Sequence, residues 1–438
     1  MTRSVVLIDG EHYPPVTQQG VDAVRARGYE VVAAVFCGGG EKLSRALELG
    51  EIPIVRGESA LHALDEALSS YAPDVVVDLS DDPVVDHAQR MRLASIALAR
   101  NVAYEAPGFR MDPPPRPRVA RVPSIAILGT GKRCGKTAVS AHVARTLKAA
   151  GLRPVIVAMG RGGPDKPLVV RGDLHPPTAE SLIALAEAGN HAASDVYEDA
   201  VVAGVPAIGA RRAAAGPAGQ TAFDTVSDAV EAAHELEPDV ILLEGSGTAI
   251  PPVHADATIL VARDTDDLGA WPGSHRLLLA DLLVVRMTEG KVVPTEDSAL
   301  TSPNRVPSSV VRVNVALRPT PLGPVEGRRI YAATTAPPET GDALRDHLER
   351  TYGANVIGVT HHLADRARLE TDLRAVEGRY EILAVELKAA AIDVAARVAR
   401  QGGAEIVFVD NRPIGIGHAL EDEIAKVEEK ARQRFEDR

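Results

Sequence analysis

The segment Gly129–Thr137, of sequence GTGKRCGKT, contains the residue types that bind the phosphates of a nucleotide. It follows an apolar run, Ile125–Leu128, and precedes a helix predicted over residues 137–150. A glycine loop between a strand and a helix presents backbone N–H groups to phosphate. In such a loop the lysine reaches the outer phosphates and the hydroxyl of the last residue holds Mg²⁺. The candidate nucleotide-binding residues are Gly129, Thr130, Gly131, Lys132, Arg133, Cys134, Gly135, Lys136 and Thr137.

A second motif supplies the carboxylate that a magnesium nucleotide requires. The apolar run Asp239–Leu243 ends at Glu244, which Gly245, Ser246 and Gly247 follow. Mg²⁺ in phosphate-transferring sites is held by one or two carboxylates together with water and phosphate oxygens. We therefore predict that Thr137 and Glu244 are metal ligands. A strand that ends in an exposed glutamate and a turn is the alternative reading.

Cationic side chains near this loop are candidates for binding further phosphate. Arg161 follows the predicted strand 154–159 in the sequence AMGRGGPD. One guanidinium group can bind phosphate through two parallel hydrogen bonds. Lys132 and Arg133 lie inside the glycine loop, where anionic groups would converge. We take Lys136, Lys132, Arg133 and Arg161 as candidate catalytic residues. Asp165 is a candidate for a third metal ligand, although a glycine loop with solvated charges would explain this segment as well.

Three predicted strands near the N-terminus also end in polar or glycine-rich clusters. The first ends at Asp9-Gly-Glu-His-Tyr, the second at Cys37 and three glycines, and the third at Asp78-Leu-Ser-Asp-Asp. Any one of these clusters is explained by a simple loop, but together they outline one crevice. We predict a ligand or interface site there, made of Asp9, Glu11, His12, Tyr13, Gly38, Gly39, Gly40 and Lys42.

Other polar residues carry weaker signals. His361 and His362 are adjacent and cannot both face one side of a strand, so a metal site is not expected there. Arg412 follows a predicted strand and could meet a phosphate. His254 and Lys388 stand alone near apolar runs, where a core or surface role is the simpler explanation.

The composition sets bounds on the kind of protein. With 438 residues, the chain is long enough for two or three domains. A formal net charge of −12 argues against a nucleic-acid partner. Two cysteines do not make a disulfide framework and indicate a reducing cytoplasm. No apolar run approaches the roughly 18 residues that span a bilayer, so we expect no membrane partner.

Predicted strands alternate with predicted helices along the whole chain, which indicates an α/β fold with mainly parallel sheets. We expect a Rossmann-like N-terminal α/β domain over residues 1–110 and a proline-rich linker over 111–123. A P-loop nucleotide-binding domain should follow over 124–318, with a C-terminal α/β extension over 319–438. Glycine and proline are frequent in 162–177 and 203–219, so we predict long loops there.

The motifs resemble those of a known family. The glycine loop and the Glu244-Gly-Ser-Gly247 segment are similar to those of dethiobiotin synthetase and the cobyrinate amidases. Asp9-Gly-Glu-His-Tyr-Pro-Pro-Val16, Phe36–Leu43 and Gly131–Thr137 resemble cyclic 2,3-diphosphoglycerate synthetase, and the resemblance extends over the whole chain.

The resemblance implies ATP-dependent closure of 2,3-diphosphoglycerate into an intramolecular phosphoanhydride, with ADP and phosphate released. It implies ATP and Mg²⁺ as cofactors, and a small anionic substrate as partner. We also expect a homodimer, and an N-terminal crevice that closes over the P-loop site within one chain or across the dimer. The alternatives are a 2-phosphoglycerate kinase, another ATP-dependent ligase of the dethiobiotin synthetase-like class, and a regulatory nucleotide switch. No Asn-Lys-x-Asp segment of the guanine-specific switches is found.

Overall fold

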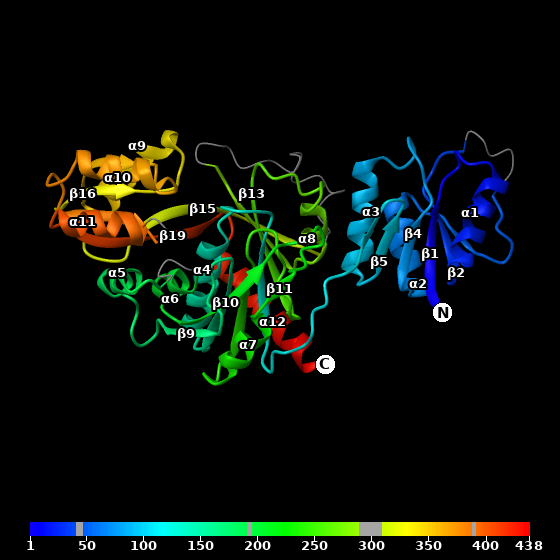
Figure 1. The fold of residues 1–438 in the computed structure, drawn as a ribbon, viewed down its shortest axis with the longest axis horizontal. Helices are drawn as coiled ribbons and strands as arrows, with labels where there is room; N and C mark the ends of the chain where they lie inside the picture. Colours follow the sequence, from blue (N-terminus) through cyan, green and yellow to red (C-terminus); the bar gives the residue numbers. More distant parts are fainter. Residues whose placement is uncertain (41–46, 191–194, 289–308, 388–390) are drawn as a thin grey trace.

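The computed structural model describes residues 1–40, 47–190, 195–288, 309–387 and 391–438. Figure 1 shows a smaller unit formed by the N-terminal residues beside a larger unit formed by the rest of the chain. The mixed α/β architecture with mainly parallel sheets confirms the predicted fold class. Within the described residues, no helix is both long enough and apolar enough to cross a membrane.

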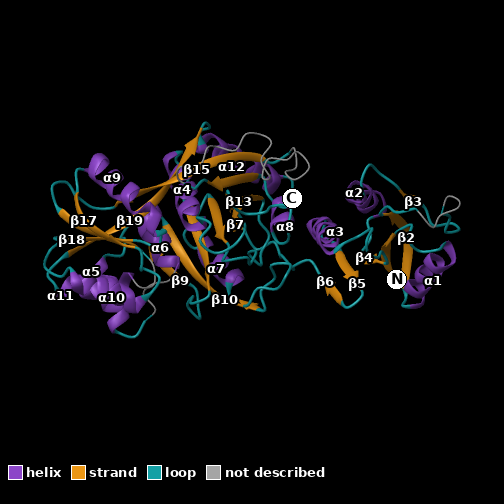
Figure 2. Ribbon diagram, turned by 90° about the horizontal axis from the view of Figure 1, so that it is seen from above, coloured by secondary structure: helices purple, strands orange, loops and turns teal. Residues whose placement is uncertain are grey.

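The N-terminal unit is a six-stranded sheet in the order β3-β2-β1-β4-β5-β6 (Figure 2). All neighbouring strands are parallel except β5 and β6. The strands are β1 (Thr2–Ile8), β2 (Tyr29–Phe36), β3 (Ile54–Val55), β4 (Val75–Asp78), β5 (Ala103–Ala106) and β6 (Phe109–Met111). The helices are α1 (Pro14–Ala26), α2 (Ala60–Tyr71) and α3 (His87–Ala99).

This sheet is parallel because its central strands are apolar on both faces. Every residue of β4 is buried, and β1 is buried from Ser4 to its end. Helices then cover both faces, as parallel sheets require. The strand order reverses between β1 and β4, so the crevice outside their carboxyl ends is the usual ligand position of such a sheet. Asp9 and Asp78 lie at that position.

The predicted linker, residues 111–123, begins at Met111, which is the last residue of β6, and its proline-rich remainder, residues 112–123, contains no helix or strand. The two units also touch directly through α3 and α8 (Gly273–Leu278). The hydroxyl oxygens of Ser95 and Ser274 lie 2.8 Å apart, and Trp271 packs against the core of the N-terminal unit. The N-terminal unit is therefore docked on the larger unit rather than joined only by the linker.

The larger unit is a 13-stranded sheet within the described residues. Its P-loop half has the order β11-β10-β8-β12-β7-β13-β14, with β9 beside β10. The strands are β7 (Ser124–Gly129), β8 (Pro154–Gly160), β9 (Leu168–Arg171), β10 (Pro206–Ala213), β11 (Phe223–Asp224), β12 (Val240–Glu244), β13 (Ala257–Arg263) and β14 (Leu282–Arg286). The helices, besides α8, are α4 (Lys136–Ala149), α5 (Ala179–Glu187), α6 (Asp195–Ala203) and α7 (Val226–His234).

The prediction of long loops over 162–177 and 203–219 is wrong. The first segment contains β9, and the second contains β10, which pairs with β8 across five residue pairs. Pro206 is the first residue of its strand, where proline is tolerated. Gly209 lies inside β10 because a side chain there would crowd Pro164, whose ring would be 3.1 Å from the new Cβ. Packing, rather than a turn, explains these residues.

The C-terminal residues extend the same sheet. β15 (Val311–Pro321) pairs in parallel with β14 and antiparallel with β19 (Glu405–Ile416). The sheet continues through β18 (Ile382–Glu386), β16 (Arg329–Ala333) and β17 (Asn355–Thr360). We call residues 321–416 the C-terminal lobe. Its helices are η1 (Pro338–Thr340), α9 (Gly341–Tyr352), α10 (Arg366–Ala375), the π-helix η2 (Ala391–Ala396) and α11 (Arg397–Gln401).

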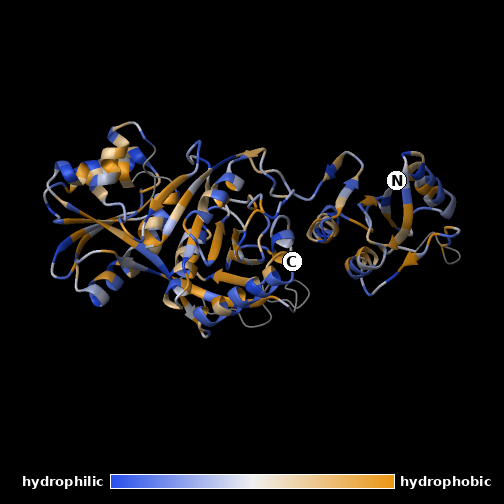
Figure 3. Cartoon of the chain, turned by 90° about the horizontal axis from the view of Figure 1, so that it is seen from below, coloured by the Kyte–Doolittle hydropathy of each residue, from blue (hydrophilic) through white to orange (hydrophobic). Residues whose placement is uncertain are grey.

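The last helix, α12 (Leu420–Glu436), returns to the P-loop half and packs against α4, β7 and β13. Its buried residues include Leu420 and Ile424, while Arg434 donates to Asp281 at 3.0 Å. Figure 3 shows the hydrophobic strands inside both units and the more polar helices around them. The lobe and the P-loop half are thus held together by sheet pairing on one side and by α12 on the other.

Candidate active site

The glycine loop wraps tightly around one lysine side chain. β7 ends at Gly129 and α4 begins at Lys136, after Gly135 with φ +106°. A Cβ at Gly129 would lie 2.7 Å from Cys134 Sγ and 2.8 Å from Lys136 Nζ, so only glycine fits there. Lys136 Nζ donates to Gly131 O at 2.8 Å and to Gly247 O at 3.4 Å. These partners are carbonyl oxygens, which hold the ammonium group at the mouth of the loop without neutralising it.

Thr137 and Glu244 meet as the sequence predicts. Thr137 Oγ1 donates to Glu244 Oε1 at 2.9 Å, and Glu244 is 5% exposed at the end of β12. Burial, followed by the charge of Asp195, raises the pKa of Glu244. Apart from the neighbouring Asp199 carboxyl, Glu244 Oε2 has no hydrogen-bond partner among the described residues. A buried carboxylate beside a threonine hydroxyl fits the oxygen ligands that Mg²⁺ prefers.

Three further carboxylates come from α6, which sequence reasoning missed. Asp195 and Glu198 line the same cavity, and Asp199 is fully buried beside Glu244. Burial and then the charge of Glu244 raise the pKa of Asp199 well above its usual range. The spacing of four residues between Asp195 and Asp199 puts both on one helix face. That spacing was the available signal, but it is common on helices and does not by itself point to a site.

Asp165 does not join this group. It is exposed, accepts a hydrogen bond from Lys166 N at 3.1 Å, and does not line the cavity. Arg161, four residues earlier, does line it. No group of three or more His, Cys, Asp or Glu side chains in the described residues could hold a metal ion unaided. Thr137 and Glu244 are therefore the residues that fit a magnesium nucleotide, whose phosphates and waters complete the coordination.

A cavity of about 420 Å³ lies over the loop. Its P-loop wall contains Lys132, Arg133, Gly135, Lys136, Thr137, Gly160, Arg161, Glu244, Ser246 and Gly247. Of the other predicted loop residues, Thr130 donates to Asp266 and Cys134 is buried beneath the loop. Arg286, at the end of β14, donates to Arg133 O at 3.2 Å and also lines the cavity.

The opposite wall comes from the C-terminal lobe, and the sequence held only a weak signal for it, the segment Asp410-Asn-Arg-Pro413. Thr335, Glu386, Asp410 and Asn411 line the cavity. Thr334 and Thr335 donate their hydroxyls to the two oxygens of Glu386, at 2.7 and 2.9 Å. Asp410 is 2% exposed and pairs with Arg145 of α4 at 3.0 Å. The site therefore lies between the carboxyl ends of P-loop strands and those of lobe strands.

The weaker candidates lie elsewhere. Arg412 pairs with Asp410 at 3.2 Å and does not line the cavity. His362 contacts Asp372, and His361 contacts the carbonyl of Ala336. His254 lies 3.6 Å from Asp256, and Lys388 falls outside the described residues.

The predicted N-terminal site forms a compact cluster of its own. Asp9, 1% exposed, accepts hydrogen bonds from the backbone N–H groups of Glu11, His12 and Asp81, and contacts His12 Nδ1 at 2.8 Å. A Cβ at Gly10 would lie 2.6 Å from the backbone of Gly39, so the two loops touch.

The remaining members of that predicted site are spread around the cluster. Tyr13 is 61% exposed, Gly38 and Gly39 have positive φ, and Gly40 follows them. Lys42 lies outside the described residues. Among the described residues, none from the N-terminal unit lines the P-loop cavity. Closure of this crevice over the P-loop remains a prediction.

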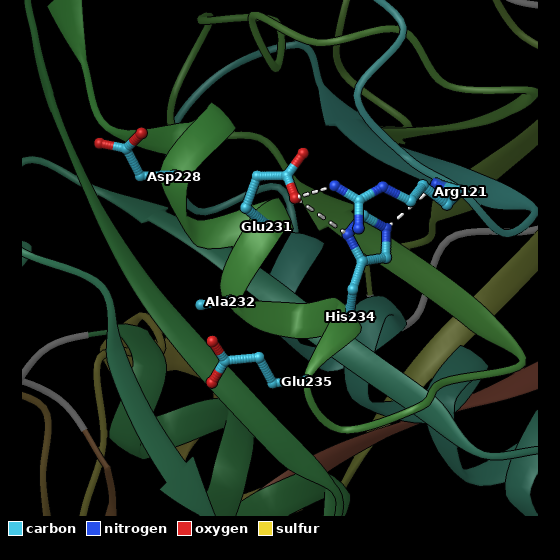
Figure 4. Close-up of a pocket in the computed structure, with 6 residues that line it drawn as sticks. All are labelled: Arg121, Asp228, Glu231, Ala232, His234 and Glu235. Carbon is cyan, nitrogen blue, oxygen red and sulfur yellow. Dashed lines mark hydrogen bonds and ion pairs between the residues drawn. The ribbon is translucent and has the colours of Figure 1, made fainter.

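A second hollow lies on the P-loop half around α7, shown in Figure 4. Arg121 pairs there with Glu231, and Arg121 N donates to His234 Nε2 at 3.0 Å. Asp228 and Glu235 complete an acidic rim at the surface. This hollow carries none of the phosphate-binding residues, so it is not the candidate active site.

Comparison with protein families gives three matches along the chain. Residues 3–112 match the cyclic 2,3-diphosphoglycerate synthetase N-terminal domain, residues 124–307 its P-loop domain, and residues 321–412 its C-terminal domain. Together they account for most of the sequence.

Curated proteins give the same result. The chain is 42% identical to a cyclic 2,3-diphosphoglycerate synthetase of Thermococcus gammatolerans, with 97% of each chain covered. It is 40% identical to that of Rubrobacter xylanophilus, with 95% of each covered. It is 38% identical to that of Methanothermus fervidus, with 98% of this chain and 97% of the relative covered.

Among solved structures, LpxK from Aquifex aeolicus in complex with ATP aligns with 17% identity and a TM-score of 0.44. The alignment covers 73% of this chain and 90% of LpxK.

Proposed function

The chain belongs to the cyclic 2,3-diphosphoglycerate synthetase family and is a bond-forming, ATP-dependent enzyme; we propose that it closes 2,3-diphosphoglycerate into its cyclic phosphoanhydride, releasing ADP and phosphate. The observation that carries the proposal is the convergence of Lys136, Thr137 and Glu244 with Arg161 around one cavity. Nucleotide phosphates and a highly anionic acceptor both need a cavity lined by cationic side chains and by ligands for Mg²⁺. Sequence identity of 40–42% over nearly the whole chain to relatives named cyclic 2,3-diphosphoglycerate synthetase supports the choice of substrate.

Two displacements account for the reaction. In the first, an oxygen of one substrate phosphate attacks the γ-phosphorus of ATP, and the bond to ADP breaks. In the second, an oxygen of the neighbouring phosphate attacks the phosphorus that now carries the transferred group, and inorganic phosphate leaves. The attacking oxygens are already ionised near neutral pH, so no residue has to remove a proton. The first step exchanges the β–γ P–O–P bond of ATP for a P–O–P bond on the substrate. The second step exchanges that bond for the P–O–P bond that closes the ring.

Phosphoryl transfer depends on positioning and on neutralising charge more than on acid–base chemistry. Lys136 is placed to bind the β- and γ-phosphate oxygens, and Arg161, Lys132 and Arg133 to bind the acceptor. Thr137 and Glu244 would hold Mg²⁺, which neutralises phosphate charge when bound. The wall formed by Thr335 and Glu386 limits the space above the loop, which helps exclude water from the transferring group.

Product analysis tests the proposal. The protein is incubated with ATP, Mg²⁺ and 2,3-diphosphoglycerate, and the mixture is followed by phosphorus NMR. We expect the two monoester resonances to be replaced by those of a phosphoanhydride, with one ADP and one phosphate formed per ring. Release of AMP and pyrophosphate would contradict the scheme.

The same measurement separates the alternatives. Production of 2,3-diphosphoglycerate from 2-phosphoglycerate without ring closure would identify a kinase. Slow ATP hydrolysis that no phosphorylated acceptor stimulates would identify a nucleotide switch. Turnover with a carboxylate acceptor in place of the diphosphate would identify another ligase.

A further inference from the structure

We propose that Arg161 and Ser246, with buried Arg212 behind them, form the subsite for the acceptor phosphate, on the other side of Gly247 from Lys136. The inference rests on the proposed function, because it assigns the phosphate that attacks ATP to named residues. Arg212 lies in β10, the strand that the sequence did not reveal, and Ser246 lies in the loop after Glu244.

Two guanidinium groups converge over Gly247. A Cβ at Gly247 would lie 2.6 Å from Arg161 Nη2 and 3.5 Å from Arg212 Nη2. Both distances start from one point, so the two nitrogens are separated by at most their sum, 6.1 Å. Charge-assisted N–H···O bonds to phosphate are about 2.7–2.9 Å long, so one phosphoryl group can bridge nitrogens this far apart.

Among the described residues, no ion pair joins either arginine to a carboxylate, although the charge of Asp195 acts on Arg212. Arg212, 4% exposed, donates through Nη1 to Ala214 O at 2.6 Å and through Nη2 to Ser246 O at 2.8 Å. Its Nε has no partner among the described residues. Burial and then the charge of Arg161 lower the pKa of Arg212. The charge of Asp195 acts in the opposite direction and raises the pKa of Arg212, but it does not outweigh burial and Arg161. A buried cation that is only partly compensated is costly, and a bound anion lowers that cost.

Ser246 connects the buried arginine to the cavity. Arg212 Nη2 also donates to Ser246 Oγ, at 3.2 Å. The serine hydroxyl therefore accepts from Arg212 and keeps its own proton for an oxygen in the cavity, which Ser246 lines. Arg161 is exposed on the same wall and makes no hydrogen bond or ion pair with a described residue. Arg161 and Ser246 are thus the contacting groups, and Arg212 is a positioning residue.

The subsite has the right place relative to ATP. The carbonyl of Gly247 accepts from Lys136 Nζ at 3.4 Å, while its Cα faces the arginine pair. One residue therefore separates the lysine expected at the outer nucleotide phosphates from the groups expected at the acceptor. Absence of a side chain at Gly247, whose φ is +63°, leaves that space open. This juxtaposition holds an attacking oxygen close to the γ-phosphorus.

Direct binding measurements test the assignment. Calorimetric titration with 2,3-diphosphoglycerate, at saturating Mg²⁺ and a non-hydrolysable ATP analogue, compares wild type with Arg161→Gln and Arg212→Lys. We expect Arg161→Gln to weaken 2,3-diphosphoglycerate binding about 10- to 100-fold, as loss of a charged hydrogen bond does. The affinity for the ATP analogue alone should stay within about twofold, because Lys136 and Thr137 are intact.

Arg212→Lys keeps the positive charge but loses the hydrogen-bond geometry that fixes Ser246. Its affinity for 2,3-diphosphoglycerate should therefore lie between that of wild type and that of Arg161→Gln. Arg153→Gln is the matched control. Arg153 precedes β8 as Arg161 follows it, and it pairs with Asp239 at the opposite edge of the sheet. Its binding of both ligands should equal that of wild type.

The outcomes distinguish this assignment from the proposed function. If wild type and Arg161→Gln bind 2,3-diphosphoglycerate equally well, the subsite assignment is wrong and the proposed function stands. If wild type binds the ATP analogue but no 2,3-diphosphoglycerate, the proposed function fails and the assignment fails with it. Arg161 is exposed, so its variant remains informative even if Arg212→Lys does not fold.

Discussion

The chain has two sheet edges where glycine loops and carboxylates gather, and they differ in how their polar groups are satisfied. In the N-terminal crevice, Asp9 accepts from three backbone N–H groups, and Asp78 accepts from Ser80, Arg90 and Tyr104. Beside the P-loop cavity, the buried carboxyls of Glu244 and Asp199 hydrogen-bond each other, and burial together with their mutual repulsion raises the pKa of Asp199. Two buried carboxyls that rely on each other in this way are where we expect a cation to bind.

The P-loop cavity thus has charged groups available to a ligand, whereas the polar groups of the N-terminal cluster bind one another and hold two loops together. The ligand site expected at the N-terminal cluster stays a prediction. Both regions obey the same rule of α/β sheets, in which strand ends carry function. By that rule, either region could bind a ligand. Only the hydrogen-bond partners of the individual side chains distinguish the two regions.

Replacing the P-loop lysine should have the largest effect. In Lys136→Ala the ammonium group that contacts Gly131 O and Gly247 O is lost, and with it the charge opposite the transferring phosphate. We expect kcat to fall by about 10³-fold, the scale seen when a positioned transition-state donor is removed. Steady-state assays of ADP release measure this. A variant that folds like wild type and keeps more than a tenth of its activity would contradict the assignment.

Glu244→Gln should have a smaller effect that depends on magnesium. The amide keeps the shape and still accepts from Thr137 but loses the negative charge, so the requirement for Mg²⁺ should rise. We expect turnover to fall about 100-fold at limiting Mg²⁺ and partial recovery at high Mg²⁺. Titration of activity against Mg²⁺ concentration measures both. An unchanged Mg²⁺ dependence would mean that Glu244 does not hold the metal.

Asp9→Ala tests the other region. It leaves the N–H groups of Glu11, His12 and Asp81 without their acceptor in a buried position, which should lower the free energy of unfolding by about 2–4 kcal/mol. Denaturant unfolding can be followed through the single tryptophan, Trp271, which packs against the N-terminal core. The affinity for 2,3-diphosphoglycerate should not change.

If a folded Asp9→Ala protein lost affinity for 2,3-diphosphoglycerate, the N-terminal cluster would be part of the substrate site. Tyr13→Phe is the matched variant for this point, because it changes an exposed side chain of the same loop without removing the Asp9 hydrogen bonds. It should leave both stability and binding as they are.

The junction between the regions gives the smallest effect. His275 is 1% exposed in α8, stacks on Trp271 with ring centroids 5.6 Å apart, and has a pKa lowered to about 3 by burial and by the charges of Arg276 and Arg116. The unfolded chain therefore binds a proton near pH 6.5 that the folded protein does not. Stability should fall as pH drops below 6.5, by at most about 1.4 kcal/mol per pH unit.

Denaturant unfolding between pH 7 and pH 5 measures this slope, and His275→Gln is the comparison. The glutamine variant should show a shallower dependence because it lacks the titrating group. Equal slopes for the two proteins would show that His275 does not contribute to the acid sensitivity of the junction.

Short sequence motifs were enough to predict the part of the site that is formed by the glycine loop and Glu244. The strand before the glycine loop and the helix after it are found as β7 and α4, because a continuous apolar run and a helical pattern sit on either side of GTGKRCGKT. Glu244 ends a strand, and its contact with Thr137 follows from the neighbouring positions of β7 and β12. These inferences needed only short stretches of sequence and the general rules of parallel sheets.

The remainder of the site depends on tertiary packing that no short stretch encodes. Asp199 lies in a helix and Arg212 in a strand that carry no recognisable motif. The proline and glycine residues of β10 led to the prediction of a loop there. Glu386 and Asp410 reach the cavity only because β15 and β19 turn the lobe toward α4. The N-terminal cluster, conversely, had site-like residues whose mutual pairing could not be read from their types.

An experimental structure with 2,3-diphosphoglycerate, Mg²⁺ and a non-hydrolysable ATP analogue bound would show directly where each ligand binds. We predict both molecules in the cavity between the glycine loop and the C-terminal lobe, with nucleotide phosphates at Lys136 and an acceptor phosphate across Gly247 from it. Finding 2,3-diphosphoglycerate bound at Asp9 and Gly38–Gly40, with only nucleotide in the P-loop cavity, would contradict this prediction.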